Sequence, residues 1–184
     1  MTITPDTKDW TWVLEQPCPE CGFDPQDYPR DALAAKVREN ARQWAAVLAG
    51  EHLEVRPSED VWSPFEYGCH VRDIYRIMDG RLALLLSEDD PVFQNWDQDE
   101  TALEERYDLQ NPRIVAGELD DAAATYAERL DAVAPTQWER TGTRSNGSPF
   151  TVATLGTYSL HDVVHHLWDV SSSPSSSAPS TPDA

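Results

Sequence analysis

The stretch Tyr158-Ser-Leu-His161-Asp-Val-Val-His165-His166-Leu-Trp-Asp169 carries three of the five histidines of the chain. Its apolar residues recur at spacings of three and four, and no glycine or proline interrupts residues 157–170, which predicts an amphipathic helix. His161 and His165 are four residues apart, so they project from one face of this helix. Two imidazoles placed in this way can hold one metal ion if another helix supplies a third ligand. The alternative is a helix end whose histidines simply favour the negative pole of the helix dipole.

Three further segments have the periodicity of amphipathic helices, so the predicted fold is an all-α four-helix bundle. The first helix is expected at 31–48, with Asp31 as its N-cap. The second begins at Ser63-Pro64-Phe65-Glu66, a capping box with proline at the first helical position, and continues for about six turns. The third is expected at 112–134, and the fourth begins after Thr151 as N-cap and carries the histidines.

Two connections stand out between these helices. Residues 88–110 are acidic and mostly polar, and they predict a long connection between the second and third helices, with a short helix near 102–107. A solvated connector is the preferred interpretation of this segment, and an active-site lid is the alternative. Residues 137–150 contain Asn146-Gly147, which is typical of a loop or a small hairpin.

The composition of the chain divides it into three parts. Five prolines before residue 30 exclude a long helix there, so 1–30 is expected to be an irregular leader. In this leader, Thr11-Trp-Val-Leu predicts a short strand or a segment laid on the core, with Trp10 or Trp12 as its anchor. Residues 31–170 form the predicted bundle, and 171–184, which are rich in serine and proline, are expected to be a disordered tail.

The charge of the chain is strongly unbalanced. It has 33 acidic and 14 basic residues, which gives a formal net charge of −19. Nucleic acids and anionic membranes both require a positive surface, so we expect neither as a partner. No apolar run approaches the roughly 20 residues of a membrane span, and the N-terminus lacks the pattern of a signal peptide. A cytoplasmic protein is therefore expected, and a homodimer is compatible with the sequence.

The leader also contains Cys18-Pro-Glu-Cys21-Gly. A structural zinc site needs four ligands, and the sequence has no second CxxC. The pattern of a thioredoxin-like redox motif is absent as well. Two free thiols are the preferred interpretation. A labile local disulfide, or half of a metal site that a second chain completes, are the alternatives.

A third histidine lies near the start of the second predicted helix. His70 is four residues before Ile74 on the apolar face, so it is expected to lie close to the core. Such a histidine is more often a hydrogen-bonded core residue than a ligand, but the pair on the fourth helix requires a partner. Asp73 could orient an imidazole or add a carboxylate, and its alternative is a solvated helix position.

These features together resemble the DinB superfamily, which includes the mycothiol- and bacillithiol-dependent S-transferases. The resemblance covers about residues 30–170. It rests on Trp62-Ser63 followed by Glu66-Tyr67-x-x-His70-Val71, and on His161-Asp162-x-x-His165-His166-Leu167. In that family a histidine near the start of helix two and two ligands spaced by four on the last helix bind one divalent metal.

By position, the resemblance implies His70, His161 and His165 as the metal ligands. His166 is left out because it projects about 100° away from that face. Three imidazoles leave coordination positions open, as in catalytic sites. Zn²⁺ is the expected ion, and Ni²⁺, Mn²⁺ and Fe²⁺ are alternatives.

The expected activity is that of a thiol-dependent S-transferase, in which a metal-activated thiolate of a low-molecular-weight thiol attacks a small electrophile. The pocket for the electrophile is expected near Trp62, Tyr67, Tyr158 and Trp168. A metal-dependent hydrolase, with Asp73 or Asp162 reaching a metal-bound water, is the enzymatic alternative. A non-enzymatic, stress-associated binding protein is the third hypothesis.

Overall fold

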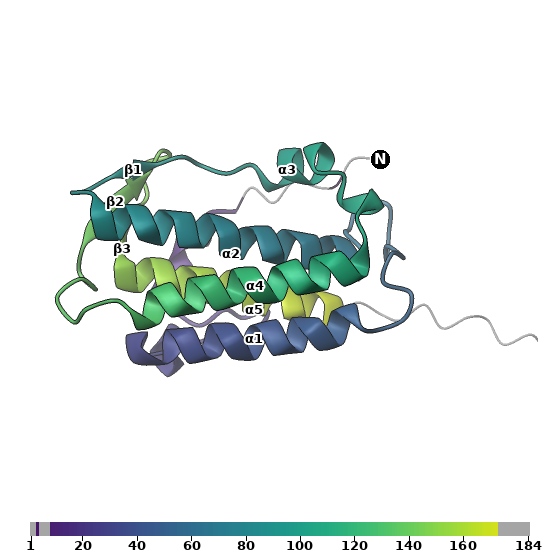
Figure 1. The fold of residues 1–184 in the computed structure, drawn as a ribbon, viewed down its shortest axis with the longest axis horizontal. Coiled ribbons are helices and arrows are strands. Elements are labelled where there is room, and N and C mark those ends of the chain that lie inside the picture. Colours follow the sequence, from purple (N-terminus) through teal and green to yellow (C-terminus); the bar gives the residue numbers. More distant parts are fainter. Residues whose placement is uncertain (1–2, 4–7, 173–184) are drawn as a thin grey trace, which may run out of the picture.

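Four long helices form the bundle that the sequence predicts (Figure 1). The computed structural model describes residues 3 and 8–172. The helices are α1 (Leu33–Leu48), α2 (Pro64–Ser87), α4 (Pro112–Asp131) and α5 (Val152–Ser172). None of the described helices combines the length and the hydropathy that crossing a bilayer requires. The disordered tail was predicted from residue 171, but α5 extends to Ser172. The rest of the predicted tail, residues 173–184, lies outside the described residues.

The helix starts follow the capping signals in most cases. Ser63 and Glu66 form the predicted capping box of α2, and Thr151 exchanges hydrogen bonds with Thr154 at the start of α5. At α1 the prediction is wrong by two residues, because Asp31 lies in a 3-10 turn, Arg30–Ala32, and the helix begins at Leu33 without a side-chain cap.

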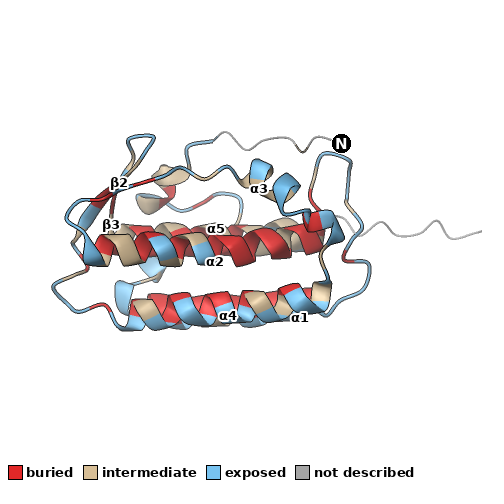
Figure 2. Ribbon diagram, turned by 45° about the horizontal axis from the view of Figure 1, so that its top comes forward, coloured by how far each residue is buried: buried red, intermediate tan, exposed pale blue. Residues whose placement is uncertain are grey.

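The helices are not arranged in simple up-and-down order. Ion pairs join Arg72 of α2 to Glu118 of α4 and Asp79 of α2 to Arg129 of α4, so these two helices run parallel. The connection between them returns along the whole bundle to make this possible (Figure 1). Helices α1 and α4 present a buried stripe to the interior and an exposed stripe to solvent, whereas α2 and α5 are buried or half-buried around most of their circumference (Figure 2).

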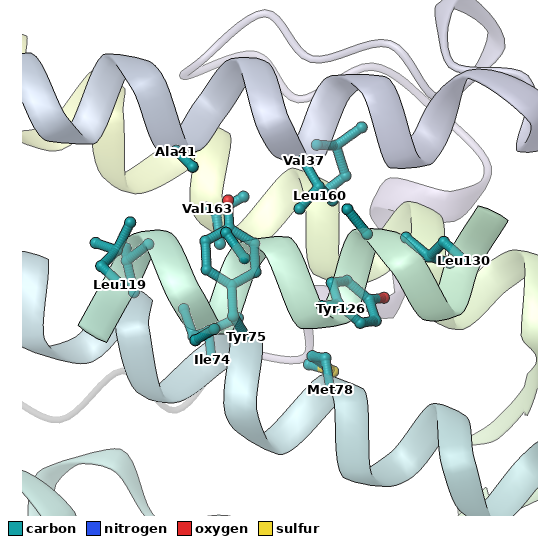
Figure 3. Packing of buried hydrophobic residues seen from close by; sticks show 14 of the residues in the cluster. Val37, Ala41, Ile74, Tyr75, Met78, Leu119, Tyr126, Leu130, Leu160 and Val163 are labelled. Carbon is teal, nitrogen blue, oxygen red and sulfur yellow. The ribbon is translucent and has the colours of Figure 1, made fainter. Parts of the chain in front are cut away.

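The core is mostly apolar and contains a polar junction that joins three of the helices. Tyr75, Val163 and Ala41 belong to the buried cluster of this region (Figure 3). The Tyr75 hydroxyl donates to Asn40 Oδ1 (2.7 Å), and Asn40 Nδ2 donates to the carbonyl of Val163 (3.1 Å). These bonds join α2, α1 and α5, and each is worth about 1 kcal/mol. Trp44 of α1 is completely buried next to this junction.

A small three-stranded sheet closes one end of the bundle. Strands β2 (Thr141–Arg144) and β3 (Pro149–Thr151) form the hairpin predicted around Asn146-Gly147, and β1 (Val92–Phe93) pairs parallel to β2. The sequence did not predict β1, which is only two residues long. The short helix of the connection, α3, lies at Gln98–Glu104 rather than at 102–107.

The leader is irregular, as predicted, and it packs against α5. Residues 10–14 form a 3-10 turn, so the prediction of a strand there is wrong and that of a segment laid on the core is right. Val13 is its fully buried anchor, whereas Trp10 and Trp12 are only partly buried.

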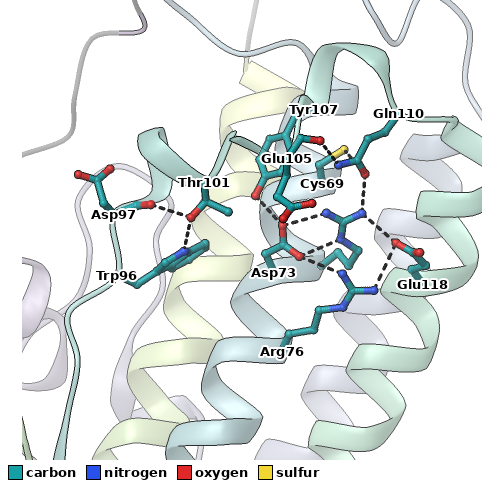
Figure 4. Close-up of polar contacts among 11 residues, drawn as sticks. Cys69, Asp73, Arg76, Trp96, Asp97, Thr101, Glu105, Tyr107, Gln110 and Glu118 are labelled. Atoms are coloured by element: carbon teal, nitrogen blue, oxygen red, sulfur yellow. Dashed lines mark hydrogen bonds and ion pairs between the residues drawn. The ribbon is translucent and has the colours of Figure 1, made fainter. Parts of the chain in front are cut away.

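Asp73 is part of a buried polar network between α2, α4 and the end of the connection (Figure 4). Arg72 binds its carboxylate through two nitrogens, each at 2.9 Å, and the Tyr107 hydroxyl donates to it at 2.6 Å. Burial alone would raise the pKa of Asp73, but the bonds from Arg72 and Tyr107 hold it below its usual value. Asp73 is therefore neither solvated nor available to the histidines, which corrects both interpretations from the sequence.

We predict that Asp73→Ala lowers the free energy of unfolding by about 3–5 kcal/mol, because Arg72 would remain as a buried charge without its main partner. Urea denaturation measures the difference. Since the folded-state pKa of Asp73 is lowered, its contribution is present above about pH 4 and is lost as the pH falls further.

The matched control is Asp79→Ala, which breaks the more exposed ion pair with Arg129 between the same two helices. Its cost should stay below about 1 kcal/mol. Equal losses in the two variants would contradict a special role for the Asp73 network.

Candidate metal centre

A cavity of about 890 Å³ lies between the leader, the start of α2, the connection after β1 and one face of α5. Its lining combines seven carboxylates with five aromatic side chains, which are Trp10, Trp62, Tyr67, Trp96 and Tyr158. The predicted pocket residues Trp62, Tyr67 and Tyr158 are thus in place, whereas Trp168 is 37% exposed and is not part of the lining.

Helix α5 presents two pairs of ligand-bearing side chains to its surroundings. His161 and His165 form one pair, and Asp162 and His166 form a second pair one residue further along. Both pairs have the spacing of four that places side chains on one helix face, and the one-residue offset turns the second pair by about 100°. The two pairs therefore face different neighbours.

The second pair meets His70 of α2. The ligand atoms of His70, Asp162 and His166 all lie within 4.8 Å of one another. The capping box fixes the first turns of α2 and so sets the position of His70. The ring of His70 is completely buried between Trp62 and Trp96, with centroids 4.9 and 5.2 Å away.

Both ring nitrogens of His70 lack a hydrogen-bond partner, and so does Nε2 of His166. Burial lowers the pKa of His70 to about 3, with His166 adding to the shift, so its ring is neutral near pH 7. Buried polar atoms are nearly always paired, and each one left unpaired costs about 1–3 kcal/mol. Unpaired nitrogens that converge on a carboxylate are the arrangement expected of metal ligands.

Two carboxylates hold the ring of His166. Its Nδ1 donates to Asp169 Oδ2 at 2.8 Å, while Nε2 lies 3.4 Å from Asp162 Oδ1 without hydrogen-bond geometry. Burial would lower the pKa of His166, but Asp162 and Asp169 outweigh it and raise the pKa to about 9 in the metal-free protein. A carboxylate bound to the far nitrogen of a histidine is the usual support of a metal-ligating imidazole.

The donor set therefore fits a divalent metal ion. Two imidazoles and one carboxylate suit Zn²⁺ and other first-row ions. Three protein ligands leave at least one coordination position, and Asp162, 32% exposed, borders the cavity. An open position beside a cavity is the arrangement of a catalytic rather than a structural metal site.

The first pair on α5 meets the leader instead. Cys18, Cys21, His161 and His165 form the second group whose ligand atoms lie within 4.8 Å of one another. Burial lowers the pKa of His161 to about 4 and raises that of Cys21 to about 11. A thiol with so high a pKa is a poor nucleophile, which argues against a redox-active CxxC.

The three predicted ligands are thus divided between two groups. His70 lies with Asp162 and His166, whereas His161 and His165 lie with the two cysteines. His166, which the sequence interpretation left out, occupies the position beside His70. The signal that could have found it is the spacing of four between Asp162 and His166, which repeats that of His161 and His165. His52 is exposed, as expected.

The comparisons with known proteins agree with this architecture. A family model of the DinB superfamily matches residues 33–170. Among solved structures, YfiT from Bacillus subtilis superposes with a TM-score of 0.71 at 16% identity, covering 78% of this chain and 84% of that one. YfiT is described as a probable metal-dependent hydrolase with an unusual four-helix bundle topology. No curated protein matches the chain in a sequence comparison. The family match spans most of the described bundle, and the chain belongs to the DinB superfamily.

Proposed function

We propose that this protein is a divalent-metal-dependent enzyme and that His70, Asp162 and His166 hold its metal. The observation that carries the proposal is the convergence of a nitrogen from each of two imidazoles, His70 and His166, with the Asp162 carboxylate at the wall of a large cavity, where these nitrogens are buried without hydrogen-bond partners. Zn²⁺ is the first candidate, with Ni²⁺, Mn²⁺ and Fe²⁺ as alternatives.

We further propose that the reaction transfers a low-molecular-weight thiol to a small electrophile. When bound, the metal would lower the pKa of a thiol and hold its sulfur ready for attack. The sulfur would bond to the electrophilic carbon, the leaving group would depart with its electron pair, and the thiol proton would pass to solvent. The stacked ring of Trp96 and the tilted ring of Trp62 keep His70 in position and exclude water from it.

The cavity supports a small-molecule substrate. Its volume is within the range of roughly 300–1,000 Å³ that is usual for ligand pockets. Lys8 and Arg144 line it together with seven carboxylates, and Lys8 is paired with Glu20 at 3.2 Å, so the charge of the lining does not select an anionic substrate.

Metal-dependent hydrolysis is the second candidate. The exposed edge of Asp162 could accept a proton from an attacking water, and YfiT is described as a probable metal-dependent hydrolase. In either reaction, we propose the cytoplasm as the compartment, because it keeps thiols such as Cys18 and Cys21 reduced.

A thiol-conjugation assay tests the proposal. With Zn²⁺ or Ni²⁺ bound, the protein should accelerate conjugation of monochlorobimane to at least one of cysteine, glutathione, bacillithiol and mycothiol. His70→Ala with His166→Ala should reduce the enzymatic rate by about 100-fold or more, since the ligand set is lost. His52→Asn, an exposed substitution outside the cavity, is the control and should leave the rate unchanged.

Parallel assays separate the three hypotheses. Metal-dependent hydrolysis of p-nitrophenyl acetate without added thiol, and no conjugation, would favour the hydrolase. Metal binding with neither reaction would favour a non-enzymatic binding protein. Failure of the parent protein to bind any divalent ion would contradict the enzymatic proposal altogether.

A stability measurement gives a second prediction. In the metal-free protein, His70→Leu should raise the free energy of unfolding by about 1 kcal/mol, because it removes two unpaired buried nitrogens. With metal at 100 times its dissociation constant, the parent should gain about 2.7 kcal/mol at this site, and the variant should not. Urea denaturation with and without metal measures both. A variant that is less stable than the parent in the absence of metal would contradict this account of His70.

A further inference from the structure

The second ligand group has a different chemistry from the first. It contains two cysteine sulfurs and two imidazoles, all within 4.8 Å of one another. Two sulfurs and two nitrogens make a complete tetrahedral set for Zn²⁺, with no position left for a substrate. The sequence showed both halves separately, but 140 residues separate Cys21 from His161 and only the fold joins them.

The loop that carries the cysteines places both sulfurs on the side that faces His161 and His165. The backbone N–H of Gly22 donates to the carbonyl of Cys18 (2.9 Å), and the N–H of Cys18 donates to the carbonyl of Phe23 (2.8 Å). Gly22 has a φ of +75°, a conformation that other residues rarely adopt. The loop is therefore closed by its own backbone.

Most of this group is buried, and one of its nitrogens has no partner. Cys18 is 1% exposed and His161 3%, and Phe23 packs edge-on against the His161 ring at 5.3 Å. His161 Nε2 is buried without a hydrogen-bond partner. An unpaired, buried nitrogen in contact with thiols again points to a metal ligand.

The orientation of His165 supports the same conclusion. Its Nδ1 faces Cys18 Sγ at 3.7 Å, and its Nε2, on the opposite side of the ring, lies 3.3 Å from Glu20 Oε2. Glu20 stands between the two cysteines in the sequence, so the same short loop supplies two sulfurs and a carboxylate for the far nitrogen of the histidine. This is the support that metal-ligating histidines usually have.

We propose that Cys18, Cys21, His161 and His165 bind one Zn²⁺ in a closed structural site that fixes the leader to α5. The ion is held within a single chain, and no second chain is required. It is separate from the open site at His70, and the inference stands whether or not the chain is an enzyme. The two thiols would release their protons to solvent on binding.

The position of this site gives it a role in the shape of the cavity. Trp10 and Glu20 of the leader line the cavity, and Trp10 packs against both ligand imidazoles, with centroids 5.4 Å from His161 and 4.9 Å from His165. A zinc ion bound to the leader and to α5 would hold this wall in place.

Metal analysis of the purified, zinc-loaded full chain tests the proposal. Cys18→Ser with Cys21→Ser should lose about one equivalent of zinc per chain relative to the parent. Cys69→Ser is the matched control, because Cys69 is buried in α2 outside both ligand groups, and it should lose none. His70→Ala with His166→Ala should retain the cysteine-dependent equivalent, which separates failure of this site from failure of the open one.

Spectroscopy of the parent protein covers the case in which the cysteine variant does not fold. The Co²⁺-substituted parent should show thiolate-to-cobalt charge-transfer absorption, and X-ray absorption of the zinc form should show sulfur at about 2.3 Å. The absence of both signals, an unchanged zinc content in the cysteine variant, or a Cys18–Cys21 disulfide in the protein purified with zinc would each overturn the proposal.

Discussion

The burial of imidazole rings along α5 is the constraint on which the rest of this structure depends. Nitrogens of His70, His161 and His166 are removed from water without receiving hydrogen bonds in exchange. Each such atom costs about 1–3 kcal/mol, and in most proteins a mutation would readily relieve it. The packing of the apolar core and the hydrogen bonds among Asn40, Tyr75 and Val163 offset this loss of stability. Buried polar atoms without hydrogen-bond partners are most often found at functional sites.

Three faces of helix α5 contact three different parts of the molecule. Leu160 and Val163 enter the core, His166 faces α2, and His161 and His165 face the leader. Asp169 lies where the last two faces meet: Oδ2 accepts from Nδ1 of His166 at 2.8 Å, and Oδ1 lies 3.7 Å from Nε2 of His165. One carboxylate therefore touches an imidazole of each ligand group, so the two groups share a support.

The unusual helix order also places a part of the chain against the candidate metal site at His70. Because α2 and α4 run parallel, the connection between them must return along the bundle, and it passes over the start of α2 (Figure 1). Trp96 of this connection stacks on His70, and Tyr107 near its end binds Asp73. The segment that the sequence suggested as a solvated connector thus closes one side of the cavity and is fastened to α2 by a buried network (Figure 4).

The sequence by itself determined the local features, because these depend on neighbours a few residues away. Helical periodicity, the Ser63–Glu66 capping box, the Thr151 cap and the Asn146-Gly147 hairpin could all be predicted. The period of a helix also shows which side chains share a face, so the pairing of His161 with His165 was predictable. It does not show which neighbour that face meets. The contact of Cys18 with His165 spans 147 residues, and that of His70 with His166 joins two helices. The fold alone decided that the three predicted ligands would belong to two different groups, because packing sets the rotation of α5 about its axis.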